Sequence, residues 1–106
     1  MTNGTDLVHR YFDLAPGADT QAYFALFDED ALVEDEGQER QGSAAIRAWR
    51  AEVPTVRYEV RDIRDENGTQ VARVMISGDF PGSPVLLTFR FTFTAVGLIS
   101  ELRIRG

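Results

Sequence analysis

The spacing of the hydrophobic residues changes once along the chain, near Pro54, from a helical period to a strand period. Before this point apolar residues recur as they do on one face of an α-helix. After it, apolar and polar residues alternate, and Asn67-Gly68 and Pro81-Gly82 stand where tight turns are needed. Helices followed by an antiparallel meander predict an α+β domain, with the helices packed on one side of the sheet.

Three helices are expected before Pro54, over residues 7–15, 20–27 and 43–53. Pro16-Gly17 ends the first, and Asp19 and Ser43 are suitable N-caps for the other two. A short strand is expected over residues 31–35, and a polar loop between Gly37 and Gly42. The apolar faces of the helices are formed by Leu7, Val8, Tyr11, Phe12 and Ala15, by Ala22, Tyr23, Leu26 and Phe27, and by Ala45, Ile46, Trp49 and Val53.

Four strands are expected after Pro54, over residues 56–63, 71–80, 85–94 and 98–105. The alternation is clearest in residues 85–94, where three phenylalanines alternate with Thr88, Arg90 and Thr92. One face of the sheet is therefore expected to be apolar and the other rich in Thr and Arg. The polar face would be either solvated or the surface of a homodimer, since two-fold dimers are the commonest soluble assembly.

Composition excludes several classes of function. A net charge of −6 disfavours nucleic acid and anionic membranes as partners. The absence of Cys and Lys excludes thiol nucleophiles and lysine Schiff bases, and the single histidine, His9, excludes mechanisms that need two. The acidic run around Asp30 lacks the ligand spacing of a calcium loop, so we expect no metal. The first six residues do not resemble a signal peptide, and no apolar run is long enough for a membrane helix, so a cytoplasmic protein is expected.

Three segments carry a resemblance to a known superfamily: "RYFDL" at 10–14, "ALFDEDALVEDEG" at 25–37 and "GSAAIRAW" at 42–49. They resemble the ketosteroid isomerase and nuclear-transport-factor-two-like superfamily, and within it the SnoaL-like small proteins related to polyketide cyclases. This resemblance implies one domain over residues 1–106. It would be a cone-shaped α+β fold with three N-terminal helices packed on a curved, mostly antiparallel sheet around a pocket.

The resemblance also implies roles for individual residues. Asp35 matches the general base of the isomerases, and Tyr11 matches the tyrosine that hydrogen-bonds the oxyanion of the substrate. Leu32 and Val33 beside Asp35 would partly desolvate its carboxylate. A small apolar ligand would be bound without a cofactor, in a pocket with aromatic walls formed by Phe27, Trp49, Phe89 and Phe91.

The chain also departs from the isomerase pattern. The second oxyanion donor, a protonated aspartate, corresponds to Phe89, and two further tyrosines of the isomerases correspond to Phe27 and Arg50. The Asp–Arg–Asp set of the related epoxide hydrolases and the histidine of the related dehydratases are not matched. Only half of the isomerase oxyanion hole is therefore present.

Three functions follow as alternatives. The first is a cofactor-independent isomerase, cyclase or dehydratase with Asp35 as base and Tyr11 as donor. The second is a non-enzymatic binding protein that uses the same pocket, and the third is a dimeric interaction domain with a vestigial pocket. Each residue also has a simpler interpretation, since Asp35 lies in an acidic run typical of solvated loops and Tyr11 lies on the apolar face of a helix.

Overall fold

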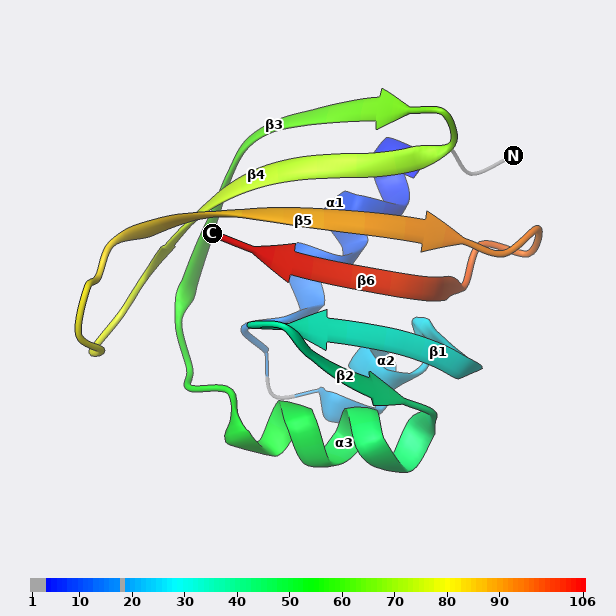
Figure 1. Ribbon diagram of the computed structural model, residues 1–106, viewed down its shortest axis with the longest axis horizontal. Helices are drawn as coiled ribbons and strands as arrows, with labels where there is room; N and C mark the ends of the chain where they lie inside the picture. The colour runs from blue at the N-terminus through cyan, green and yellow to red at the C-terminus, as the bar shows by residue number, and fades with distance from the viewer. Residues whose placement is uncertain (1–3, 18) are drawn as a thin grey trace.

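Six strands in the described part of the chain form one sheet, which is the frame of the molecule (Figure 1). The structure is a computed structural model that describes residues 4–17 and 19–106. Residues 1–3, which belong to the segment inspected for a signal peptide, lie outside the described residues. The helices are α1 (Gly4–Leu14), α2 (Thr20–Phe24) and α3 (Ser43–Glu52). The strands are β1 (Phe27–Asp35), β2 (Gln38–Gln41), β3 (Arg57–Glu66), β4 (Thr69–Ser77), β5 (Val85–Phe93) and β6 (Ile99–Arg105).

The strands are ordered β2-β1-β6-β5-β4-β3 across the sheet. Strands β3 to β6 form the antiparallel meander that the alternation predicts, and the Asn67-Gly68 turn between β3 and β4 has the positive φ angles of 55° and 89° typical of a tight hairpin. Among the strands that the structure describes, only β1 and β6 pair in parallel, with Asp35 opposite Ile104. The α+β class and a mostly antiparallel sheet are therefore confirmed.

The helices and the sheet enclose one aromatic core. Figure 1 shows α1 behind the sheet and α3 alongside β1 and β2. The predicted face of α1 is buried, and its Tyr11 and Phe12 pack on strand β5, with ring centroids 5.1 Å apart for both the Tyr11–Phe91 and the Phe12–Phe89 pair. The inner side of the sheet is apolar, whereas Arg90 on the other side is exposed, as the alternation predicts.

Two predictions about the first half of the chain were wrong. Phe27 does not continue the second helix but begins β1, because the chain joins the sheet there: the Ile99 amide donates to the Leu26 carbonyl at 2.8 Å, and Phe27 pairs with Ile99. The expected polar loop after Gly37 is strand β2, which pairs antiparallel with β1. Its side chains are polar because it is an edge strand exposed to solvent.

The third helix follows β1 and β2 rather than following the other two helices directly. This order places α3 beside β1 and β2, at one edge of the sheet (Figure 1), and Asp35 is the last residue of β1. Within the described residues, no helix is long and apolar enough to cross a membrane.

Candidate functional site

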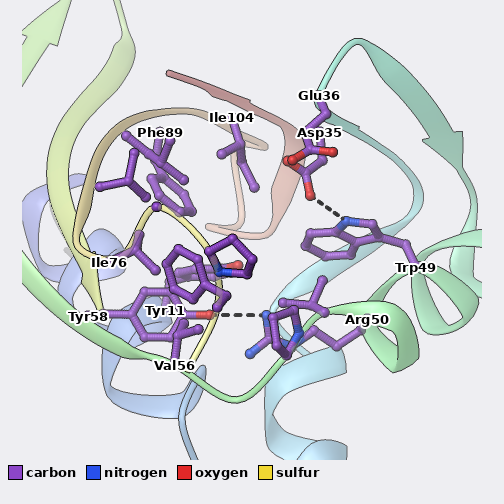
Figure 2. A pocket seen from close by; sticks show the side chains of 17 residues that line it. Tyr11, Asp35, Glu36, Trp49, Arg50, Val56, Tyr58, Ile76, Phe89 and Ile104 are labelled. Atoms are coloured by element: carbon purple, nitrogen blue, oxygen red, sulfur yellow. Dashed lines mark hydrogen bonds between the residues drawn. The ribbon is translucent and has the colours of Figure 1, made fainter. Parts of the chain in front are cut away.

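A cavity of about 450 Å³ lies between α1, α3 and the inner side of the sheet. Figure 2 shows the side chains that line it, and strands β1, β3, β4, β5 and β6 each contribute at least one of them. Most of its wall is apolar, with contributions from Val53, Val56, Ile76, Val85, Leu87 and Ile104. A cavity with apolar walls and a few polar groups is the usual form of a small-molecule site.

Asp35 enters this cavity because of its place in the strand. Side chains alternate across a sheet, so the residue after Ala31 and Val33 on the inner face is Asp35. Both of these neighbours are fully buried, and Asp35 itself is half-buried. Glu34 points to the opposite face, where it pairs with Arg103 at 3.0 Å and Arg105 at 2.7 Å. Alternation therefore separates an inner carboxylate from an outer ion-pair cluster.

Trp49 orients the Asp35 carboxylate. The indole Nε1 donates a hydrogen bond of 3.0 Å to Oδ2 of Asp35 (Figure 2). Helical spacing places Trp49 on the same buried face of α3 as Ile46, and its side chain is only 4 % exposed, so the donor is fixed. Oδ1 of Asp35 has no hydrogen-bond partner among the described residues, and it remains free to accept a proton or a hydrogen bond from a ligand.

Tyr11 forms a buried pair with Tyr23 from α2, with 2.9 Å between the two hydroxyl oxygens. Burial raises the pKa of Tyr11 well above its usual value. Burial also raises the pKa of Tyr23 to about 12, although the positive charge of Arg50 opposes this change. Both hydroxyls therefore stay protonated at neutral pH. One of the two hydroxyl protons forms the hydrogen bond between the tyrosines. The other hydroxyl proton can therefore be donated to the oxygen of a ligand.

Arg50, near the end of α3, contributes a cation to the same wall. Its Nη1 donates to the Tyr58 hydroxyl at 3.3 Å, and its Nη2 donates to the Ala15 carbonyl at 2.5 Å. The guanidinium also lies over the ring of Tyr23, 4.6 Å from its centroid. In Figure 2 the indole of Trp49 lies between Arg50 and Asp35. The cavity thus has a carboxylate and a guanidinium on either side of an aromatic ring.

Comparison with known proteins agrees with this architecture. The SnoaL-like domain family matches residues 8–102. The chain belongs to the SnoaL-like family. A candidate polyketide cyclase from Sinorhizobium meliloti is 38 % identical over 94 % of each chain, with a TM-score of 0.87. The predicted resemblance to SnoaL-like proteins related to polyketide cyclases is therefore confirmed, and so is the predicted ketosteroid isomerase-like fold.

More distant structures share the fold of this SnoaL-like domain. One is a protein of ketosteroid isomerase-like fold from Catenulispora acidiphila, solved with trimethylamine (16 % identity, 99 % and 87 % of the two chains, TM-score 0.79). Another is SalBIII, an epoxide hydrolase/cyclase-like enzyme in pyran ring formation (20 % identity, 95 % and 88 % of the chains, TM-score 0.78). Among the curated proteins, no significant sequence match was found.

The structure brings together four of the six residues that the sequence marks as a site. Tyr11, Asp35, Trp49 and Phe89 all line the cavity of this SnoaL-like domain. The remaining two, Phe27 and Phe91, are not among its lining residues. They pack against the ring of Tyr11, at centroid distances of 6.4 Å and 5.1 Å, and Phe91 is completely buried.

Other residues that line the cavity were not marked as site residues from the sequence. Tyr58 continues the alternation that starts at Val56, just before β3, so the direction of its side chain follows from the strand period. The loop after β4 folds back so that Phe80 and Pro81 close one side, and no local pattern predicts this position. The sequence distinguishes Arg50 only as the residue at a position where the isomerases have a tyrosine.

Proposed function

We propose that this SnoaL-like protein is a cofactor-independent acid–base enzyme of isomerase or cyclase type, acting on a small apolar ring carbonyl compound in the cavity. The observation that carries the proposal is the Asp35 carboxylate, held by Trp49 at the edge of an apolar cavity that it shares with Tyr11. A positioned carboxylate and a positioned hydroxyl are the two groups that enolisation requires.

The proposed step is a proton transfer from carbon. An oxygen of Asp35 takes the proton from the carbon next to the carbonyl, and the electrons of the broken C–H bond form the enolate. The spare hydroxyl proton of the Tyr11–Tyr23 pair hydrogen-bonds the enolate oxygen. Trp49 and Phe89 supply aromatic walls, while Phe27 and Phe91 support Tyr11 from behind.

Exchange of α-protons tests this step without knowledge of the natural substrate. 2-Tetralone, a ring ketone of suitable size, is incubated with the protein in D₂O, and loss of its α-proton signals is followed by NMR. Asp35→Asn should slow the catalysed exchange by about a hundredfold or more. Asp30→Asn makes the same change at an exposed position of β1 and should leave exchange unaltered. Equal exchange by the wild type and Asp35→Asn would refute Asp35 as the base.

A second function, ligand binding without chemistry, is favoured by one observation. Phe89 stands where the isomerases have their second oxyanion donor, so this side of the cavity offers only a ring. Saturable binding of 2-tetralone, with no exchange by the wild type, would support this alternative.

We also propose a homodimer, formed through the polar face of the sheet that carries Thr88, Arg90, Thr92 and Arg103. This proposal rests on the frequency of two-fold dimers among soluble proteins. Sedimentation over a range of concentrations tests it, and a monomer at high concentration would refute it. If the dimer forms but no small molecule binds, the protein is better described as an interaction domain.

A further inference from the structure

The charge of Arg50 is not balanced by any neighbour that the structure describes. Its side chain is half-buried in the cavity wall, and none of the ion pairs between described residues includes it. Its contacts are a hydroxyl, a carbonyl and aromatic rings, all of them uncharged. Because a charge removed from water is costly unless it is paired, a partly buried lone cation favours binding of an anion.

Arg50 also keeps donors free for a ligand. A guanidinium has five N–H donors in a planar fork, and the structure pairs only one on each terminal nitrogen. The remaining three have no partner among the described residues. Oxygen anions are the partners that this planar geometry fits best.

A structural role explains only part of this arrangement. Arg50 lies in the last turn of α3, where the helix dipole favours a cation, and its bond to Ala15 ties α3 to the end of α1. These contacts position the guanidinium, but they neutralise none of its charge. A helix tie alone would not require the group to line the cavity.

The cavity is therefore polarised. Asp35 lies on one side of Trp49, which donates to it, and Arg50 lies on the other, 6.0 Å from the Trp49 ring centroid (Figure 2). A ligand that spans the two would present a proton-bearing carbon to the carboxylate and an oxygen to the guanidinium.

We propose that Arg50 is the anion-binding group of this cavity, and that the ligand is an apolar ring compound bearing a carboxylate. This inference deepens the proposed function and rests on it for the identity of the site. Arg50 stands at a position where the isomerases have a tyrosine, so it adds a positive charge that their cavity lacks. Phe89, in turn, stands where the isomerases have their second oxyanion donor.

Two probes of the same shape test the inference. 2-Naphthoate carries a carboxylate and 2-naphthamide carries a neutral amide in its place, and the affinity of each is measured by isothermal titration calorimetry at neutral pH. The wild type should bind the carboxylate about ten- to a hundredfold more tightly than the amide, as expected of a charge-assisted hydrogen bond. Equal affinities, tighter binding of the amide, or no binding of either probe would overturn the inference.

Substitutions on α3 then assign the preference. Arg50→Gln should abolish the preference for the carboxylate, and Arg50→Lys should keep part of it because the charge remains. Arg47→Gln is the matched control, since Arg47 lies on the same helix but stacks on Phe24 outside the cavity, and it should keep the full preference. Circular dichroism checks that each variant folds. If Arg50→Gln does not fold, Arg50→Lys carries the assignment: a reduced preference for the carboxylate is expected, and a preference equal to that of the wild type would overturn it.

The two proposals fail in different ways. Equal binding of the two naphthyl probes overturns the role of Arg50 and leaves Asp35 as a candidate base. Unchanged 2-tetralone exchange in Asp35→Asn overturns the base and leaves the anion preference intact.

Discussion

The indole nitrogen of Trp49 donates a hydrogen bond of 3.0 Å to the carboxylate of Asp35, and this bond joins α3 to the end of β1. The two residues are 14 positions apart and come from different layers of the fold. The bond fixes one carboxylate oxygen and leaves the other directed to the cavity. The bond therefore positions the carboxylate on which the proposed chemistry depends.

Removal of the Trp49 donor should weaken the fold through this bond. Trp49→Phe keeps an aromatic ring but loses the N–H and part of the buried volume, and we expect a loss of about 1 to 3 kcal/mol in the free energy of unfolding. Urea denaturation measures it. In a double-mutant cycle with Asp35→Ala the two losses should be less than additive by about 1 kcal/mol. Strictly additive losses would show that the bond contributes nothing.

Alkaline titration should reveal the buried tyrosine pair. The chain has three tyrosines, and burial raises the pKa of Tyr11 well above its usual value and that of Tyr23 to about 12. Ultraviolet difference spectra of the folded protein should therefore show two tyrosines that do not ionise near pH 10. A spectrum in which all three ionise together while the protein is folded would contradict the pair.

The same pair predicts how stability depends on pH. Tyr11 and Tyr23 ionise more readily in the unfolded chain, near pH 10, than in the folded protein. Their contribution to stability is full below that pH and is lost as the pH rises toward 12. Thermal melts between pH 9 and 12 should show a decline that is smaller in the Tyr11→Phe/Tyr23→Phe double variant. An equal decline in both proteins would refute the linkage.

Phe89 and Phe91 should differ in what their substitution affects. Phe91 is completely buried and lies outside the cavity lining, whereas Phe89 is buried but lines the cavity. Both Leu substitutions should cost about 1 to 2 kcal/mol of stability. Calorimetry with 2-naphthoate should show a changed affinity only for Phe89→Leu. A larger change in Phe91→Leu would mean that the ligand reaches beyond the residues that line the cavity and contacts the core.

The outer face of the sheet should stabilise the protein in a pH-dependent way. Hydrogen bonding from Arg105, with the nearby charge of Arg103, lowers the pKa of Glu34 below its usual 4.5. The contribution of this carboxylate is present above the unfolded pKa and is lost as the pH falls through the lower folded value. The melting temperature of Glu34→Gln should therefore be lower than that of the wild type at pH 7. The two melting temperatures should converge once the pH falls below the folded pKa of Glu34.

Glu29→Gln provides the control for this comparison, since Glu29 is exposed on the same strand and forms no ion pair with a described residue. The melting temperature of Glu29→Gln should equal that of the wild type at every pH in this range. A Glu34→Gln protein that melts like the wild type at pH 7 would mean that the surface pairs are fully screened by solvent.

The resemblance to the isomerases marks Tyr11 and Asp35 as site residues, and local patterns predict which way their side chains point. The helical period places Tyr11 and Trp49 on buried faces, and the strand period places Asp35 and Phe89 on the inner side of the sheet. These four residues share a cavity because each element turns one face to a common core. Phe27 and Phe91 satisfy the same periods, yet they lie behind Tyr11, since a period gives the direction of a side chain but not its depth.

The sequence by itself determined the α+β class, the four-stranded meander and the inward face of each long element, because these depend on contacts between near neighbours in the chain. Only the tertiary structure decided that Phe27 begins a strand, that residues 38–41 form a sheet edge, and that the guanidinium of Arg50 lies over the ring of Tyr23. Strand β2 pairs with its neighbour β1 through a hairpin, whereas the other two features depend on contacts between distant segments, as Leu26 with Ile99 and Arg50 with Ala15 show. Such contacts stabilise the fold only once the chain has closed, and no local spacing encodes them.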